Sequence, residues 1–118
     1  MPLLNRRRAP AADEFVVAAR SEEVGDGVMT AVKIGGRKIL LTRDNGKVYA
    51  IDGLCPHAAA DLTQGSLRHW QLCCHEHNYC FDIRSGRIVW PEDEVYRLRR
   101  YAVMENDGQI LVRLSPPL

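Results

Sequence analysis

The most evident absence in this chain of 118 residues is a long apolar run. No segment approaches the roughly 20 consecutive apolar residues that a membrane-spanning helix requires, so we expect no association with a membrane. No stretch of about ten residues or more has the 3.6-residue apolar period of an amphipathic helix. The sequence also lacks an internal repeat, a phosphate-binding glycine loop and a recognisable catalytic triad. These absences argue against a helical bundle, a nucleotide-binding enzyme and a hydrolase, and the length predicts one domain with its own core.

A strong charge of either sign is absent as well. The net charge is +1, and Arg6–Arg8 lie within the first eight positions, which contain no acidic residue. The rest of the chain therefore carries a net charge of −2, which gives no indication of a nucleic-acid partner. The apolar segment that follows the arginines of an export signal is missing, because Asp13-Glu14 comes soon after them. We expect residues 1–13 to form a disordered tail and the protein to be cytoplasmic.

What the sequence does contain is a series of β-strand patterns. Asn45-Gly46 and Asp107-Gly108 each separate two apolar segments, and such pairs supply the positive φ angles that tight hairpins require. Gly35-Gly36 marks another turn. The pattern predicts an all-β domain over residues 14–118. The expected strands cover residues 14–19, 28–34, 37–43, 47–51, 100–104 and 109–114.

An insert of about residues 53–90 separates the first four of these strands from the last two, and it contains all four cysteines and all four histidines. Cys55-x-His57 and, after a 16-residue spacer, Cys74-x-x-His77 each offer one thiolate and one imidazole. Two sulfur and two nitrogen ligands in matched pairs suit a two-iron, two-sulfide cluster, in which one iron takes both cysteines and the other both histidines. The run Cys73-Cys74-His75 offers a rival thiolate–imidazole pair.

The segment from Cys55 to Asp82 resembles the Rieske iron–sulfur signature. Phe81-Asp82 follows His77 at the spacing of that signature, which favours Cys74 over Cys73 as a ligand. The resemblance implies a Rieske fold, in which an antiparallel β-sandwich base carries an inserted cluster-binding subdomain, and it implies one [2Fe-2S] cluster. The implied ligands are Cys55, His57, Cys74 and His77. Further landmarks that match the family are Pro56, Leu62, Gly65, Gly86 and Pro91.

Cys73 and Cys80 are left without a role by this ligand set. We expect both to be small buried side chains, because free cysteine is among the most buried residue types. A labile disulfide between them is the alternative, and it depends on their relative geometry.

The resemblance also bears on the reduction potential. High-potential Rieske proteins of the cytochrome bc-type complexes carry an extra cysteine pair that ties the two loops, and hydroxyl donors aimed at the sulfurs. Here the positions of the cysteines hold Ala60 and Glu76, and the positions of the donors hold Tyr79 and Phe81. The resemblance therefore predicts a potential at the low end of the Rieske range, at about −150 to 0 mV.

The chain looks like the ferredoxin component of multicomponent aromatic-ring-hydroxylating dioxygenases. That resemblance implies a monomeric one-electron carrier, which takes electrons from an NAD(P)H-dependent flavin reductase and passes them to a terminal oxygenase. About 36 residues follow Asp82, too few for the mononuclear-iron domain of a Rieske oxygenase, so we expect no enzymatic activity from this chain. One alternative is the small subunit of an assimilatory nitrite reductase. The other is a structural zinc module, although C-x-H spacing is unusual for zinc.

Overall fold

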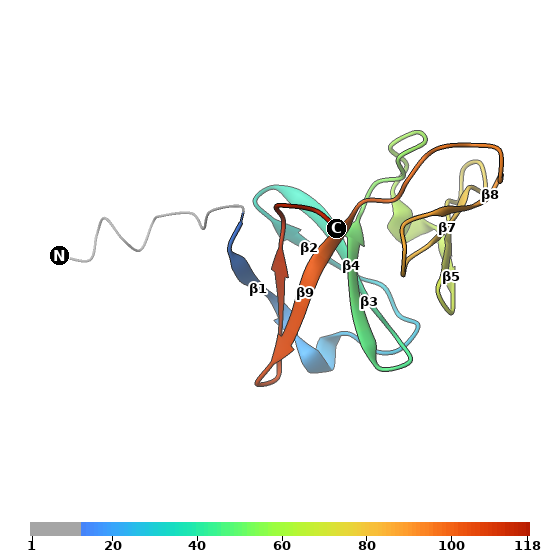
Figure 1. Ribbon diagram of the computed structural model, residues 1–118. Helices are drawn as coiled ribbons and strands as arrows, with labels where there is room; N and C mark the ends of the chain where they lie inside the picture. Colours follow the sequence, from blue (N-terminus) through green and yellow to red (C-terminus); the bar gives the residue numbers. More distant parts are fainter. Residues whose placement is uncertain (1–12) are drawn as a thin grey trace.

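The computed structural model describes residues 13–118, which form ten β-strands (Figure 1). Six of them make the base, an antiparallel sheet in the order β1-β10-β9-β4-β3-β2. Their bounds are β1 Phe15–Arg20, β2 Thr30–Ile34, β3 Arg37–Asp44, β4 Lys47–Asp52, β9 Arg100–Asn106 and β10 Gln109–Arg113. Each of the six begins and ends within two residues of a strand predicted from the sequence, so the all-β prediction is confirmed.

Three two-residue turns set the register of the base. Gly35-Gly36 joins β2 to β3, Asn45-Gly46 joins β3 to β4, and Asp107-Gly108 joins β9 to β10; both residues of each turn have a positive φ. A turn with positive φ at both positions has the twist that antiparallel strands need. The strands on either side therefore pair from the first residue, as Asp44 does with Lys47.

The base sheet bends into a sandwich. Its two three-stranded halves join through two pairs of residues on β4 and β9, Ala50 with Tyr101 and Ile51 with Arg100. The edge strands β1 and β2 contact each other at the other side. The buried residues enclosed in this way are Ala19, Val24, Ile39, Leu41, Val48, Ala50, Tyr101, Ile110 and Val112.

Strand β3 is buried on both faces. Ile39 and Leu41 belong to the core of the base, whereas Leu40 belongs to a second core beneath the insert, together with Ile51 of β4. Successive side chains of a strand point to opposite faces, so a strand that is covered on both sides has a continuous apolar sequence. This explains the run Ile39-Leu40-Leu41 and shows how the insert is attached to the base.

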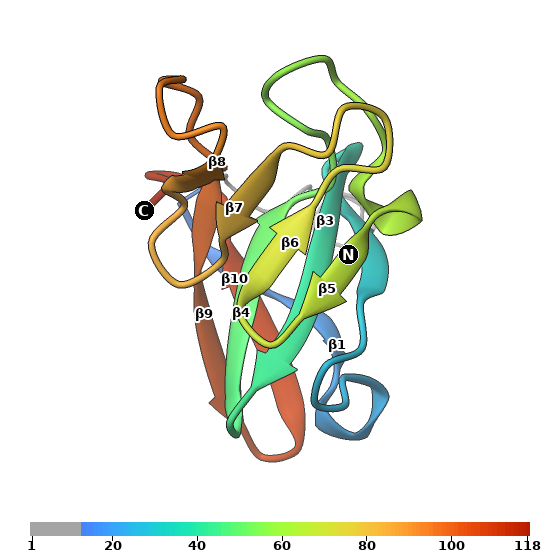
Figure 2. The ribbon, with the colours of Figure 1, turned by 90° about the vertical axis from the view of Figure 1, so that its right-hand side faces the viewer.

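The insert is the excursion between β4 and β9, residues 53–99. Four short strands form its sheet in the order β5-β6-β7-β8 (Figure 2). They are β5 Ser66–Arg68, β6 Gln71–Cys73, β7 Cys80–Asp82 and β8 Ile88–Trp90. Phe81 and Leu72 on this sheet are fully buried, and so is Ile83 just after it. These side chains pack in the second core against the outer face of β3 and β4, which positions the insert on the base.

Helical structure within residues 13–118 is confined to two 3₁₀ turns, Ser21–Glu23 and Leu62–Gln64. None of the helical segments in this part of the chain is long and apolar enough to cross a membrane. The tail predicted for residues 1–13 lies, except for Asp13, outside the described residues.

Candidate metal centre

Two loops with the same backbone geometry carry the four predicted ligands. In the first loop, the N–H of Cys55 donates to the carbonyl oxygen of Ala60 at 2.8 Å, and the N–H of Ala59 donates to the carbonyl oxygen of Cys55 at 2.7 Å. Ala59 has a positive φ of 56°. We call residues 55–60 the first loop and residues 74–79 the second loop.

The second loop repeats this pattern. The N–H of Cys74 donates to the carbonyl oxygen of Tyr79 at 2.7 Å, and the N–H of Asn78 donates to the carbonyl oxygen of Cys74 at 3.0 Å. Asn78 also has a φ of 56°. Asparagine tolerates this left-handed conformation better than most residues. The histidine is the third residue of the first loop and the fourth residue of the second. The two similar backbones therefore carry their imidazoles at positions that differ by one residue. Both loops project from the same end of the insert (Figure 2).

The predicted ligands lie in two pairs, one of sulfur and one of nitrogen. Cys55 and Cys74 are 2% and 1% exposed, and neither forms a disulfide. Burial raises the pKa of the Cys55 thiol; the backbone N–H of His57 acts in the opposite direction, and the neighbouring Cys74 raises it further. The ring centroids of His57 and His77 are 4.9 Å apart, edge to face, with His57 half-buried and His77 exposed. The thiols thus lie inside the insert and the imidazoles at its surface.

This arrangement fits a two-iron, two-sulfide cluster. The Nδ1 atom of His57 is buried and makes no hydrogen bond, so a ring nitrogen is available there as a ligand. Within residues 13–118, no three His, Cys, Asp or Glu side chains gather as a site for one metal ion. A pair of thiols beside a pair of imidazoles instead matches two irons bridged by sulfide, each needing two protein ligands. His69 and His75 are exposed, and we assign them no ligand role.

An aromatic enclosure surrounds His57. The ring of Tyr79 stacks on the imidazole, with centroids 3.9 Å apart and planes 13° apart. Tyr96 approaches the same imidazole edge-on at 5.4 Å. The Tyr79 hydroxyl donates to Glu94 Oε1 at 3.1 Å, and burial together with this hydrogen bond raises the pKa of Tyr79. Sequence reasoning missed the roles of Tyr96 and Glu94, which lie in the loop of residues 91–97 beyond the signature.

The first loop is anchored to the base by an ion pair. Lys38 Nζ on β3 lies 2.8 Å from Asp61 Oδ2, just after the loop. The other carboxylate oxygen of Asp61 accepts from the N–H and the hydroxyl of Thr63. Through the first of these bonds, Asp61 caps the 3₁₀ turn Leu62–Gln64. The Lys38 hydrogen bond, followed by those of Thr63, lowers the pKa of Asp61 to about 2. Asp61 also forms a β-bridge with Leu54, which closes the neck of the first loop.

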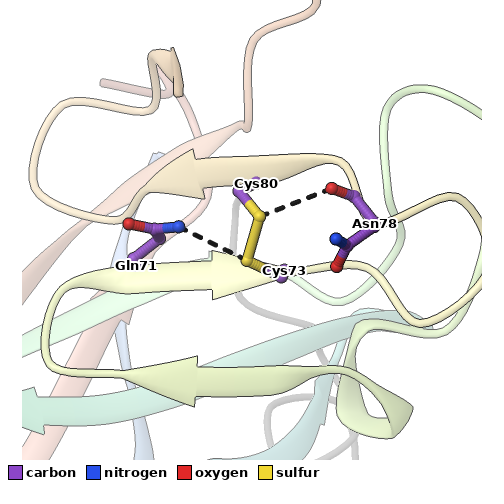
Figure 3. The surroundings of a disulfide bond; sticks show 4 residues. All are labelled: Gln71, Cys73, Asn78 and Cys80. Atoms are coloured by element: carbon purple, nitrogen blue, oxygen red, sulfur yellow. Dashed lines mark hydrogen bonds between the residues drawn. A yellow bond between two sulfur atoms is a disulfide. The ribbon is translucent and has the colours of Figure 1, made fainter. Parts of the chain in front are cut away.

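Cys73 and Cys80 are joined by a disulfide, so the expectation of two free buried thiols was wrong (Figure 3). The two residues pair directly across β6 and β7, and their Cα atoms are 4.0 Å apart. Directly opposite positions on two paired strands bring the two sulfurs together. The spacing of the two cysteines in the sequence did not indicate this strand pairing. Around the bond, Gln71 Nε2 donates to Cys73 Sγ at 3.6 Å, and Cys80 Sγ lies 3.4 Å from the carbonyl oxygen of Asn78.

This chain is similar to ferredoxins of oxygenase systems. The ferredoxin component of the alkene monooxygenase system of Xanthobacter autotrophicus is 27% identical over 104 residues, which cover 87% of this chain and 84% of that protein. The ferredoxin of carbazole 1,9a-dioxygenase from Nocardioides aromaticivorans IC177 is 34% identical, with a TM-score of 0.75 over 83% of this chain and 95% of its own.

A structure of the complex of reduced oxygenase and oxidized ferredoxin in carbazole 1,9a-dioxygenase also contains this fold. The matching chain has a TM-score of 0.77 at 20% identity and covers 86% of this chain and 94% of its own length.

The family itself follows from a match to most of the described chain. The profile of the Rieske [2Fe-2S] domain matches residues 14–102, which include the base strands β1 to β4 and the whole insert. The ferredoxin relatives carry electrons and are not catalysts. The cofactor of this domain family is the two-iron, two-sulfide group for which the paired thiols and imidazoles are suited. The chain therefore belongs to the Rieske [2Fe-2S] domain family and binds one [2Fe-2S] cluster.

Proposed function

We propose that this chain is a one-electron carrier that takes electrons from an NAD(P)H-dependent flavin reductase and delivers them to a terminal oxygenase. The observation that carries the proposal is the pairing of buried Cys55 and Cys74 with His57 and His77 at the outer end of the insert. When bound, the [2Fe-2S] cluster supplies a site that accepts and releases a single electron. We assign Cys55 and Cys74 as ligands of one iron, and the two histidines as ligands of the other.

The protein's contribution is a frame that keeps these ligands in place. The loop backbones are closed by hydrogen bonds from Cys55 and Cys74 to residues at the far end of each loop. The ion pair of Lys38 with Asp61 and the shared core on β3 attach the loops to the base. A frame of this kind limits reorganisation when the charge of the site changes, which favours rapid electron transfer.

The end of the insert offers the surface for docking. Pro56, Ala58 and Ala59 of the first loop are exposed, as is His77 of the second. Trp90, where β8 ends, is 53% exposed. Transient redox partners bury little surface, so a modest apolar area around a histidine ligand is sufficient. That a related ferredoxin is seen in a complex with its oxygenase supports an oxygenase as the electron acceptor here.

The two ferredoxin relatives named above serve an alkene monooxygenase and a carbazole dioxygenase, so the fold is compatible with more than one oxygenase. We propose an aromatic-ring-hydroxylating dioxygenase as the acceptor, and we propose that the chain is a cytoplasmic monomer.

The first experiment is to purify the chain and measure iron, acid-labile sulfide, visible absorption and electron paramagnetic resonance. Two irons and two sulfides per chain, with the spectrum of a mixed-ligand cluster, are expected. Zinc without sulfide would contradict the proposal. His77→Ala is expected to abolish the cluster spectrum, whereas the control His75→Ala, in the same loop and also exposed, is expected to leave it unchanged.

A second experiment tests the partners. The chain is reduced with NADH or NADPH and a flavin-dependent ferredoxin reductase, then mixed with ring-hydroxylating oxygenases or with assimilatory nitrite reductase. Rapid reoxidation by an oxygenase is expected. Reoxidation by nitrite reductase alone would assign the chain to nitrite assimilation instead.

A further inference from the structure

The stacked pair of Tyr79 and His57 connects the two loops. Tyr79 is the last residue of the second loop, and His57 lies in the first. Their centroid separation of 3.9 Å and interplanar angle of 13° place the two rings face to face. The neighbouring imidazole of His77 meets His57 at 86°, so the stacking partner of His57 is the tyrosine.

A third segment holds Tyr79 in this position. Glu94, in the loop of residues 91–97, accepts the hydrogen bond from the Tyr79 hydroxyl. Tyr96 of the same loop packs edge-on against both rings, at 5.4 Å from His57 and 5.9 Å from Tyr79. The loop is tied back to the insert where Arg97 forms a β-bridge with Arg87. The Tyr79 ring is therefore in contact with His57 and Tyr96, and its hydroxyl is in contact with Glu94.

No covalent bond joins the two loops in the described chain. The disulfide of Cys73 with Cys80 closes the neck of the second loop on itself, and Cys55 and Cys74 are free. Across the loops, the Tyr79–His57 stack is a direct side-chain contact between two segments distant in sequence.

We propose that Tyr79 is a positioning residue for His57: its ring, held by Glu94 and Tyr96, fixes the plane of the imidazole and keeps the two loops together around the cluster. The inference rests on the proposed function, because it takes His57 as a ligand. Aromatic pairs contribute energy beyond their buried area, and a stack on a ligand acts on the orientation of that ligand directly. Positioning by a second layer of residues is a general property of metal sites.

The test compares Tyr79→Leu with Tyr79→Phe in the protein that holds its cluster. Leucine removes the stack, whereas phenylalanine keeps the ring and removes only the hydrogen bond to Glu94. The matched control is Tyr49→Leu, because Tyr49 packs against the same core of the insert from β4, whereas the rings against His57 are those of His77, Tyr79 and Tyr96. The readouts are the electron paramagnetic resonance spectrum of the reduced protein, the reduction potential and the half-life of the visible chromophore in air.

For Tyr79→Leu we expect a shifted resonance spectrum and a chromophore half-life shortened by about two- to twelve-fold, the range that corresponds to the loss of an aromatic pair. Tyr79→Phe should keep the wild-type spectrum and lose less of the half-life than Tyr79→Leu, since the stacked ring remains and only the hydrogen bond to Glu94 is removed. Tyr49→Leu should keep the wild-type spectrum.

Two results would overturn the inference and leave the proposed function standing. The first is a Tyr79→Leu protein with the wild-type spectrum and half-life, or one no different from Tyr49→Leu. The second is a Tyr79→Phe protein that behaves like Tyr79→Leu, which would assign the effect to the hydrogen bond. A wild-type chain without iron and sulfide would instead overturn the proposed function, and the inference with it.

Discussion

Cys73 and Cys80 face each other across β6 and β7, and a disulfide joins them immediately behind the second loop. The bond leaves the next residue, Cys74, as a free and buried thiol inside the loop that the disulfide closes. Of two cysteines that are neighbours in the sequence, Cys73 is therefore part of a disulfide and Cys74 is a free thiol. Of the two bonded residues, Cys73 is half-buried and Cys80 is buried.

The first prediction separates these two roles. The double variant Cys73→Ala/Cys80→Ala should retain the iron and sulfide, because neither residue is an assigned ligand. It should lose about 2–3 kcal/mol in the free energy of unfolding, the chain-entropy estimate for a short closed loop. Urea denaturation and iron analysis measure both quantities. Cys74→Ala is the counterpart, and it should lose the cluster; the reverse pattern of iron loss would assign Cys73 as the ligand.

The second prediction concerns the reduction potential. Ala60 and Glu76 lie at the positions where high-potential Rieske proteins carry an additional cysteine pair, so no disulfide ties the two loops at these positions. Phe81 offers no hydroxyl. The hydroxyl of Tyr79 is engaged by Glu94. Because few donors are then available to stabilise the reduced site, we expect a potential of about −150 to 0 mV. A redox titration at neutral pH checks it, and a clearly positive value would refute the assignment to the low-potential group.

The third prediction concerns Gly65. A β-carbon at this position would collide with the carbonyl oxygen of Cys73, the residue before a predicted ligand. Gly65→Ala should therefore lower the free energy of unfolding by about 2–3 kcal/mol, because the obstacle is backbone that has little freedom to shift. Iron content should fall with it.

Gly108→Ala is the matched control for this substitution. Gly108 has a φ of +74° and open space around the position of a β-carbon. The expected cost is only the left-handed conformation, about 1 kcal/mol, with normal iron content. Equal effects of the two substitutions, measured by urea denaturation, would count against the steric argument.

The fourth prediction is a dependence of stability on pH. The pKa of Asp61 falls from 3.8 to about 2 on folding. A group with a lowered folded pKa adds stability above its unfolded pKa, and that stability is lost as the pH falls toward the folded value. Asp61→Asn keeps an oxygen that can cap the 3₁₀ turn. It should cost about 1 kcal/mol at pH 7, a value reduced for the partial exposure of the pair.

The difference between Asp61→Asn and wild type should shrink as the pH falls from about 4 toward about 2, the window of the shift. Urea denaturation across this range measures it. In a Lys38→Met background the substitution should have a smaller effect at pH 7, because the main cause of the shift has been removed. A difference that is constant with pH would show that the charge of Asp61 contributes nothing.

Local chemistry made the base predictable. Asn45-Gly46 and Asp107-Gly108 define hairpins through their own backbone preferences, without help from the rest of the fold. The four strands of the insert were not predicted, because three residues are too few to show an alternating pattern. Their structure depends on burial of residues such as Phe81 against the outer face of β3, which is a tertiary effect.

The candidate ligands could be proposed from the sequence because the two members of each pair lie close together in it. Cys55 and His57, like Cys74 and His77, are close in sequence and share a loop, so spacing alone suggested a ligand set. Tyr96 could not be linked to His57 in this way, because the contact depends on the return path of a loop beyond the signature. The same holds for Glu94 and its bond to Tyr79.

The two-sided burial of β3 has a consequence for spectroscopy. Ile39 and Leu41 lie in one core and Leu40 in the other, so the base and the insert share a strand and should melt together. The visible absorbance of the cluster-bound protein should then report the unfolding of the base as well as that of the insert. Bleaching of the visible bands on heating should coincide with the loss of far-ultraviolet ellipticity from the strands of the base.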